Sequence, residues 1–102
     1  MLKTLEDLIA TIRQRKSSSD ESSYTAKLLK DKSLSVEKVK EEIGELVEAV
    51  ENNSNKVHEA ADVLYHLLVY LEANEIKIED VMEELNKRKK WAMMKIISLQ
   101  KF

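Results

Sequence analysis

Two pairs of carboxylates have a spacing that could do chemistry, because the members of each pair are three residues apart. Glu42 and Glu45 form the first pair, and Glu59 and Asp62 form the second. In a helix this spacing places both side chains of a pair on one face, about one turn apart. Neighbouring carboxylates disfavour one another's ionisation unless a cation compensates their charge. Hard cations such as Mg²⁺ prefer oxygen ligands, so we predict that these four residues are the ligands of a magnesium site.

The second pair lies in residues 55–74, which predict a helix with apolar side chains on nearly every side. This pattern is typical of a buried helix, and a buried carboxylate is costly unless it has a cationic partner. Glu59, Asp62 and His66 fall within a stripe about 60° wide on the helical wheel. His66 could ligate the same cation, although we expect a neutral imidazole that is hydrogen-bonded inside the bundle. The apolar residues of this helix are Val57, Ala60, Ala61, Val63, Leu64, Leu67, Leu68, Val69 and Leu71.

Other interpretations of these carboxylates are open. In a chain with 35% charged residues, a Glu-Glu-x-x-Glu motif such as Glu41, Glu42 and Glu45 often marks a solvated helix face. A non-catalytic helical assembly module, whose carboxylates only pair with lysines, is therefore one alternative. Iron suits the pattern less well, because ferritin-like di-iron sites use Glu-x-x-His and neither pair has histidine at that position.

Composition predicts an all-α fold and limits the classes of function. The chain of 102 residues is long enough for one domain, residues 1–102, with a modest core, and it has no proline and one glycine. A net charge of −2 argues against a nucleic-acid or membrane binder, and the absence of cysteine excludes disulfides and thiolate chemistry. The first sixteen residues include acidic side chains and lack a continuous apolar segment, so we expect no secretory signal and a cytoplasmic location.

Periodicity predicts a bundle of four to five helices. We expect helices over residues 2–16, 24–30, from the N-cap Ser35 to about 52, from the cap Asn55 to 74, and from about 79 past the basic cluster 87–90. We expect a polar loop over residues 17–23 and a C-terminal helical extension over residues 91–102. The short Asn-rich connection makes the third and fourth helices antiparallel neighbours, so that the two carboxylate pairs face each other.

At these motifs the chain resembles the phosphoribosyl-ATP pyrophosphohydrolases, a family within the all-α MazG-like nucleoside triphosphate pyrophosphohydrolases. The similar stretches are SSYTAKLL at 22–29, KVKEEIGELVEAV at 38–50, EAADVLYHLLVYL at 59–71 and IEDVMEELNKR at 78–88. Two positions depart from the family pattern. Residues 20–22 replace the Pro-x-Gly that often precedes Ser-Tyr-Thr, and Lys40 replaces the glycine that often precedes the paired glutamates.

The resemblance implies Mg²⁺-dependent hydrolysis of the α–β phosphoanhydride of phosphoribosyl-ATP to phosphoribosyl-AMP and pyrophosphate, the second step of histidine biosynthesis. It implies that Glu42, Glu45, Glu59 and Asp62 bind the metal, and that Glu41 binds a further ion or orients the attacking water. The resemblance thus makes Glu41, Glu42 and Glu45 the catalytic residues. The candidate substrate contacts are Tyr24, Lys27, Lys38 and Arg88, the last reaching phosphates from a partner subunit. A broader house-cleaning nucleoside triphosphate pyrophosphohydrolase, with the same metal site and a different base pocket, is the other enzymatic alternative.

The amount of apolar surface predicts at least a homodimer that completes the bundle. The helix over residues 55–74 needs neighbours on almost all sides, yet only about three other substantial helices are available. Exposed together, the apolar residues of the tail would form a patch larger than soluble monomers commonly tolerate. Two-fold pairing is the commonest way to bury such surface. The apolar tail residues are Trp91, Met93, Met94, Ile96, Ile97, Leu99 and Phe102.

Overall fold

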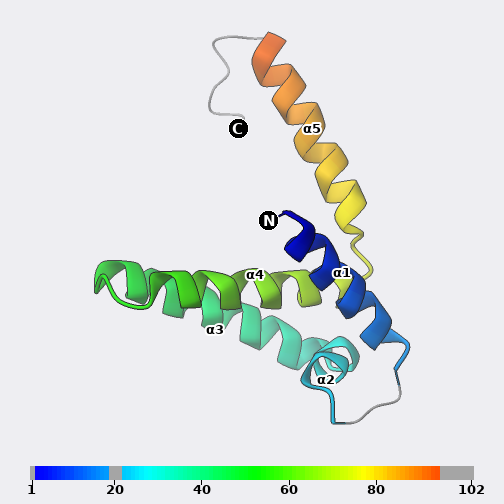
Figure 1. Cartoon of the computed structure of the whole chain (residues 1–102), viewed down its shortest axis with the longest axis vertical. Coiled ribbons are helices and arrows are strands. Elements are labelled where there is room, and N and C mark those ends of the chain that lie inside the picture. Colours follow the sequence, from blue (N-terminus) through cyan, green and yellow to red (C-terminus); the bar gives the residue numbers. More distant parts are fainter. Residues whose placement is uncertain (1, 19–21, 95–102) are drawn as a thin grey trace.

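The computed structural model describes residues 2–18 and 22–94, with side chains described as far as Lys89, and this part of the chain is all helical apart from its connections. The predicted all-α class is confirmed (Figure 1). The five helices are α1 (Leu2–Lys16), α2 (Tyr24–Lys30), α3 (Lys32–Glu51), α4 (Lys56–Ala73) and α5 (Ile78–Met94). Helix α5 thus includes the first residues of the predicted extension, and residues 95–102 lie outside the described part. None of the described helices is long and apolar enough to cross a membrane.

Side-chain caps explain where α2 and α3 begin. The Ser23 hydroxyl accepts a hydrogen bond from the Ala26 amide at 3.2 Å, and the Asp31 carboxylate accepts one from the Leu34 amide at 3.1 Å. Each bond satisfies an amide in the first turn that has no partner within its helix. Our prediction of Ser35 as the cap of α3 is wrong, because Asp31 provides that cap four residues earlier and Ser35 is buried inside the helix.

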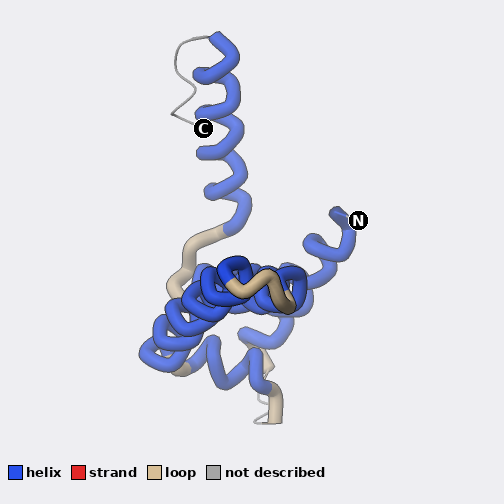
Figure 2. The backbone as a smooth tube through the Cα atoms, turned by 90° about the vertical axis from the view of Figure 1, so that its left-hand side faces the viewer, coloured by secondary structure: helices blue, strands red, loops and turns tan. Residues whose placement is uncertain are grey.

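A tight turn between α3 and α4 makes them an antiparallel hairpin, as predicted (Figures 1 and 2). Asn53 and Asn55 have φ values of 51° and 55°, a left-handed conformation that asparagine tolerates better than most residues. The Ser54 amide donates to the Ala49 carbonyl at 3.0 Å and closes the end of α3. Asn55 occupies the predicted cap position of α4, but its side chain makes no capping hydrogen bond because the residue itself is left-handed.

The hydrophobic core lies at one end of this hairpin, where α1 and α2 pack against the second half of α4 (Figure 1). The turn of the hairpin lies at the opposite end, away from α1 and α2. Burial at the core end fixes the direction of α4 and therefore the position of its carboxylates. The buried core residues are Ile12, Leu28, Leu29, Leu68, Val69 and Ala73.

The half of the hairpin near the turn keeps much apolar surface in contact with solvent. On α4, Val57 is 85% exposed, and on α3 Val50 is 58% exposed. The apolar pattern of α4 predicts neighbours on nearly every side, but the single chain buries only residues in the half that packs against α1 and α2. These residues are His66, Leu68, Val69 and Ala73. The other exposed apolar residues of the hairpin include Ile43, Val47, Leu64 and Leu67.

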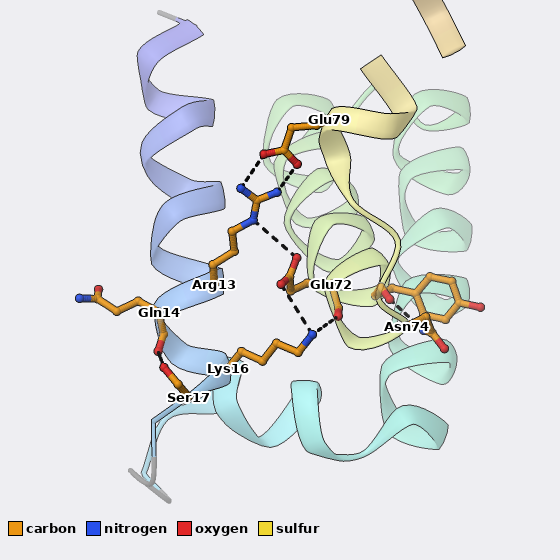
Figure 3. Close-up of polar contacts among 8 residues, drawn as sticks. Arg13, Gln14, Lys16, Ser17, Glu72, Asn74 and Glu79 are labelled. Atoms are coloured by element: carbon orange, nitrogen blue, oxygen red, sulfur yellow. Dashed lines mark hydrogen bonds and ion pairs between the residues drawn. The ribbon is translucent and has the colours of Figure 1, made fainter. Parts of the chain in front are cut away.

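Ion pairs join α1 to the end of α4 and the start of α5 (Figure 3). The Arg13 guanidinium donates to both carboxylate oxygens of Glu79, at 2.8 Å and 2.5 Å, and its Nε lies 3.7 Å from Glu72. Lys16 donates to the Glu72 carbonyl oxygen at 3.2 Å. Together with Ile78, which packs against the core, this network holds the start of α5, while the rest of α5 extends away from the hairpin (Figure 2).

Candidate active site

The two carboxylate pairs lie in the halves of α3 and α4 that are nearer the turn of the hairpin. Glu42 is only 9% exposed, and Glu59 is half-buried. Among the described residues, the Oε2 atoms of Glu42 and Glu59 are buried without a hydrogen-bond partner. A buried acceptor without a partner is rare and costly in a native protein, which points to a missing donor or cation.

Electrostatic effects show that the four carboxylates form one cluster. The pKa of Glu42 is raised by burial and by the hydrogen bond and charge of Glu45, with a further contribution from Asp62. The pKa of Glu59 is raised by burial and then by the charge of Glu45, while Asp62 acts in the same direction. Two of these effects cross the α3–α4 interface, that of Asp62 on Glu42 and that of Glu45 on Glu59, as the antiparallel arrangement predicts.

This cluster has carboxylates in excess of cations. Within the described part of the chain, no lysine or arginine forms an ion pair with Glu42, Glu45, Glu59 or Asp62. The nearby Lys38 pairs instead with Glu41, at 3.5 Å. Lysine pairing thus does not explain these four side chains. Their oxygen donors and the two unpartnered buried atoms fit a hard divalent cation.

His58 is a residue of the cluster that the sequence analysis missed. Its Nε2 atom lies 3.3 Å from the Asp62 carboxylate, and ligand atoms of His58, Glu59 and Asp62 lie within 4.8 Å of one another. A corresponding group on α3 consists of Glu41, Glu42 and Glu45. The spacing of four residues between His58 and Asp62 is the signal that could have identified it, since such residues share a helix face.

The predicted substrate contacts fall into two groups. Tyr24 and Lys38 lie beside the carboxylate cluster, because the charges of Lys38, Glu41 and Glu42 all affect the pKa of Tyr24, which burial raises. Lys27 is exposed on α2. Arg88 lies on α5 and pairs with Glu84 at 3.1 Å, so it is not brought to the cluster within this chain.

A polar cleft of about 310 Å³ adjoins the cluster at the turn of the hairpin. Glu45 and Glu59 belong to both the cluster and the cleft, so a ligand in the cleft would reach two of the predicted metal ligands. The cleft is lined by Glu45, Glu48, Ala49, Asn52, Ser54, Asn55 and Glu59.

His66 is buried and hydrogen-bonded inside the bundle, in agreement with our expectation for it. Its Nδ1 atom lies 2.8 Å from the Asp62 carbonyl oxygen, and its Nε2 atom lies 3.0 Å from the Tyr24 hydroxyl. The imidazole therefore joins the first residue of α2 to the carboxylate-bearing turn of α4, and both nitrogens are engaged away from the carboxylates.

Comparison with known proteins assigns this constellation to a family. The family model described as phosphoribosyl-ATP pyrophosphohydrolase matches residues 5–89, which include α2, α3 and α4 and most of α1 and α5. The chain belongs to this family. It is therefore an enzyme of an all-α, MazG-like type, and the resemblance drawn from its motifs is confirmed.

Individual relatives cover most of the chain. The phosphoribosyl-ATP pyrophosphatase of Rhodobacter capsulatus is 46% identical over 87 residues, which are 82% of this chain and 84% of the relative. That of Haloarcula marismortui is 40% identical over 90 residues, covering 83% and 92%. The histidine biosynthesis bifunctional protein HisIE of Pyrococcus furiosus is 40% identical over 92 residues, covering 87% of this chain and 43% of the relative. The same domain thus also occurs within a longer, bifunctional protein.

Proposed function

We propose that this chain hydrolyses phosphoribosyl-ATP at its α–β phosphoanhydride, releasing phosphoribosyl-AMP and pyrophosphate in the second step of histidine biosynthesis. The names of its relatives support the substrate. The observation that carries the chemistry is the cluster of four carboxylates on α3 and α4, with two buried oxygens that have no partner among the described residues. Such a cluster is suited to a divalent cation, and we propose Mg²⁺.

Glu42, Glu45, Glu59 and Asp62 would hold the metal. A bound Mg²⁺ neutralises phosphate charge and lowers the pKa of a coordinated water. The protein holds these ligands in place, because α3 and α4 pack side by side (Figure 1) and Glu42 is buried. Preorganisation of this kind is the main contribution a protein makes to phosphoanhydride cleavage.

Glu41 and Lys38 form the edge of the site. Glu41 is exposed and forms a group with Glu42 and Glu45, so its carboxylate can accept a proton from the attacking water and orient that water. Lys38 lies 3.5 Å from Glu41 and presents an ammonium group, which suits a phosphate oxygen. We propose that Tyr24 and Lys27 contact the nucleoside and phosphates from α2, and that Arg88 does so from a partner subunit.

We further propose that the functional unit is a homodimer in which the hairpins of two copies pack together. The exposed apolar residues Ile43, Val47 and Val50 repeat at helical spacing on α3, and Val57 and Leu64 do so on α4. Both stripes lie on the half of the hairpin that this chain leaves uncovered. A second copy offers the same two stripes, and a two-fold axis can therefore bury both at once.

A substrate panel tests the proposed function. Hydrolysis is measured with purified protein and Mg²⁺ on phosphoribosyl-ATP, ATP and deoxynucleoside triphosphates, with pyrophosphate release as the readout. We expect kcat/KM for phosphoribosyl-ATP to exceed that for the other nucleotides by at least about 100-fold, a ratio that roughly 3 kcal/mol of differential binding provides. Equal or faster turnover of ordinary triphosphates would overturn the substrate assignment in favour of a house-cleaning enzyme.

A further inference from the structure

A hydrogen-bond chain links the surface residue Tyr24 to the backbone of a predicted metal ligand. The Asp62 carbonyl can only accept, so His66 donates to it from Nδ1, across 2.8 Å. The Nε2 atom of the same ring is hydrogen-bonded to the Tyr24 hydroxyl across 3.0 Å. The bond to Asp62 thereby holds the His66 ring in one orientation, and the ring in turn holds the Tyr24 hydroxyl.

Ring contacts hold the same residues from the sides. The Tyr65 and His66 rings meet edge to face at a centroid distance of 4.9 Å, and Tyr24 stacks on Tyr65 at 6.5 Å. The Tyr65 hydroxyl is itself hydrogen-bonded to Thr25, the residue after Tyr24. These contacts leave Tyr24 45% exposed, so that part of a fixed aromatic ring faces solvent.

Tyr24 needs such a restraint because of its place in the chain. It is the first residue of α2 and directly follows the polar segment 17–23. A tyrosine at such a position loses side-chain rotational freedom when it binds a ligand, and a ring that is already fixed avoids that cost. Its hydrogen bond to His66, which itself bonds to Asp62, also places it next to the carboxylate-bearing part of α4.

We propose that His66 is a positioning residue that locks the Tyr24 ring as a stacking platform for the planar base of the nucleotide. This inference rests on the proposed function, and it adds the residue that recognises the base of the substrate. Because His66 follows Asp62 by four residues, about 6 Å along α4, the platform keeps a fixed separation from the metal ligands of that helix. Helix α4 thus aligns the Tyr24 ring on α2, which would contact the base, with Glu59 and Asp62, which would hold the metal at the phosphates.

Two variants remove the Tyr24–His66 hydrogen bond from opposite ends. Tyr24→Phe keeps the ring and removes the hydroxyl. In His66→Asn the side-chain amide lies near the position of Nδ1 and can still donate to the Asp62 carbonyl, but this side chain is too short to reach Tyr24. We expect each to raise KM for phosphoribosyl-ATP about five-fold, the factor that corresponds to about 1 kcal/mol, and to leave kcat within about two-fold. The double variant should be no worse than the poorer single variant, because both changes break one chain.

Three comparisons separate positioning from a general structural role. Tyr65→Phe keeps the ring contacts with Tyr24 and His66 and removes only the hydroxyl that bonds to Thr25, so we expect a smaller rise in KM than in Tyr24→Phe. His66→Gln extends the side chain toward the position of Nε2 and should restore much of the parent KM. Binding of pyrophosphate with Mg²⁺, measured by calorimetry, should be the same in all variants, because pyrophosphate has no base.

Several results would overturn the inference. One is an unchanged KM in Tyr24→Phe and His66→Asn, and another is an additive effect in the double variant. A third is a loss of pyrophosphate affinity in these variants as large as the rise in their KM for the nucleotide. If the parent prefers ordinary triphosphates, the proposed substrate fails, but the same KM comparison on the preferred nucleotide still decides the role of His66.

Discussion

Neutralising Glu42 is expected to stabilise the metal-free protein and to remove its response to Mg²⁺. Glu42 is almost fully buried, one of its oxygens has no partner among the described residues, and Glu45 lies beside it. Burial and Glu45 raise the pKa of Glu42, which means that the folded protein resists its ionisation. Glu42→Gln keeps the shape of the side chain, removes the charge and supplies an amide that can donate to Glu45.

The size of the effect follows from the cost of that buried atom. A buried polar group without a partner costs about 1–3 kcal/mol. Because the amide still buries polar atoms, we expect a gain at the lower end, about 1 kcal/mol in the free energy of unfolding. For a domain of this size this raises Tm by about 4–8 °C. In the parent, Mg²⁺ at 100 times its Kd should add about 2.7 kcal/mol, a gain that the variant largely loses.

Differential scanning calorimetry with chelator and with Mg²⁺ measures both effects. Glu42→Gln should melt above the parent without metal and below it with saturating metal, so the order of the two proteins reverses. Glu37→Gln makes the same substitution at an exposed position of α3 and should follow the parent in both buffers. A Glu42→Gln protein that melts below the parent in chelator, or that gains as much from Mg²⁺, would refute this account of the cluster.

Three further predictions concern other parts of the molecule. Glu45→Gln and Asp62→Asn should each lower kcat about 100-fold or more at saturating Mg²⁺, and near-parent kinetics in either would contradict the ligand assignment. Arg13 lowers the pKa of Glu79 to about 2 from its ordinary value of 4.5. The Arg13–Glu79 pair therefore stabilises the fold fully above about pH 4.5 and progressively less as the pH falls toward 2. The Tm difference between the parent and Glu79→Gln should shrink over that interval. A constant difference would argue against the pair. Light scattering at micromolar concentration should give at least twice the chain mass of 11.8 kDa, and a stable monomer mass would refute the dimer.

Local spacing made the helices and the carboxylate cluster predictable from sequence. Residues three or four apart share a helix face whatever the surrounding fold, and the short Asn-rich turn left only the antiparallel arrangement of α3 and α4. The cap of α3 was not predictable in the same way. Asp31 and Ser35 are both good capping residues, and the choice between them depends on α2 ending at Lys30, directly before Asp31.

The spacing of residues could not predict contacts between segments that are distant in sequence. The bond from Tyr24 to His66 joins residues 42 positions apart, and the bond from Arg13 to Glu79 joins residues 66 positions apart. The apolar pattern of α4 has a related ambiguity. It predicts that a side chain is buried, but not whether its own chain or a second copy buries it. Val69 is buried by its own chain, whereas Val57 on the same helix is exposed. The predicted magnesium ligands lie in the half of the hairpin that includes Val57, where this chain provides the fewest of its own contacts. That half therefore has the most to gain in stability from a bound cation and from a second copy.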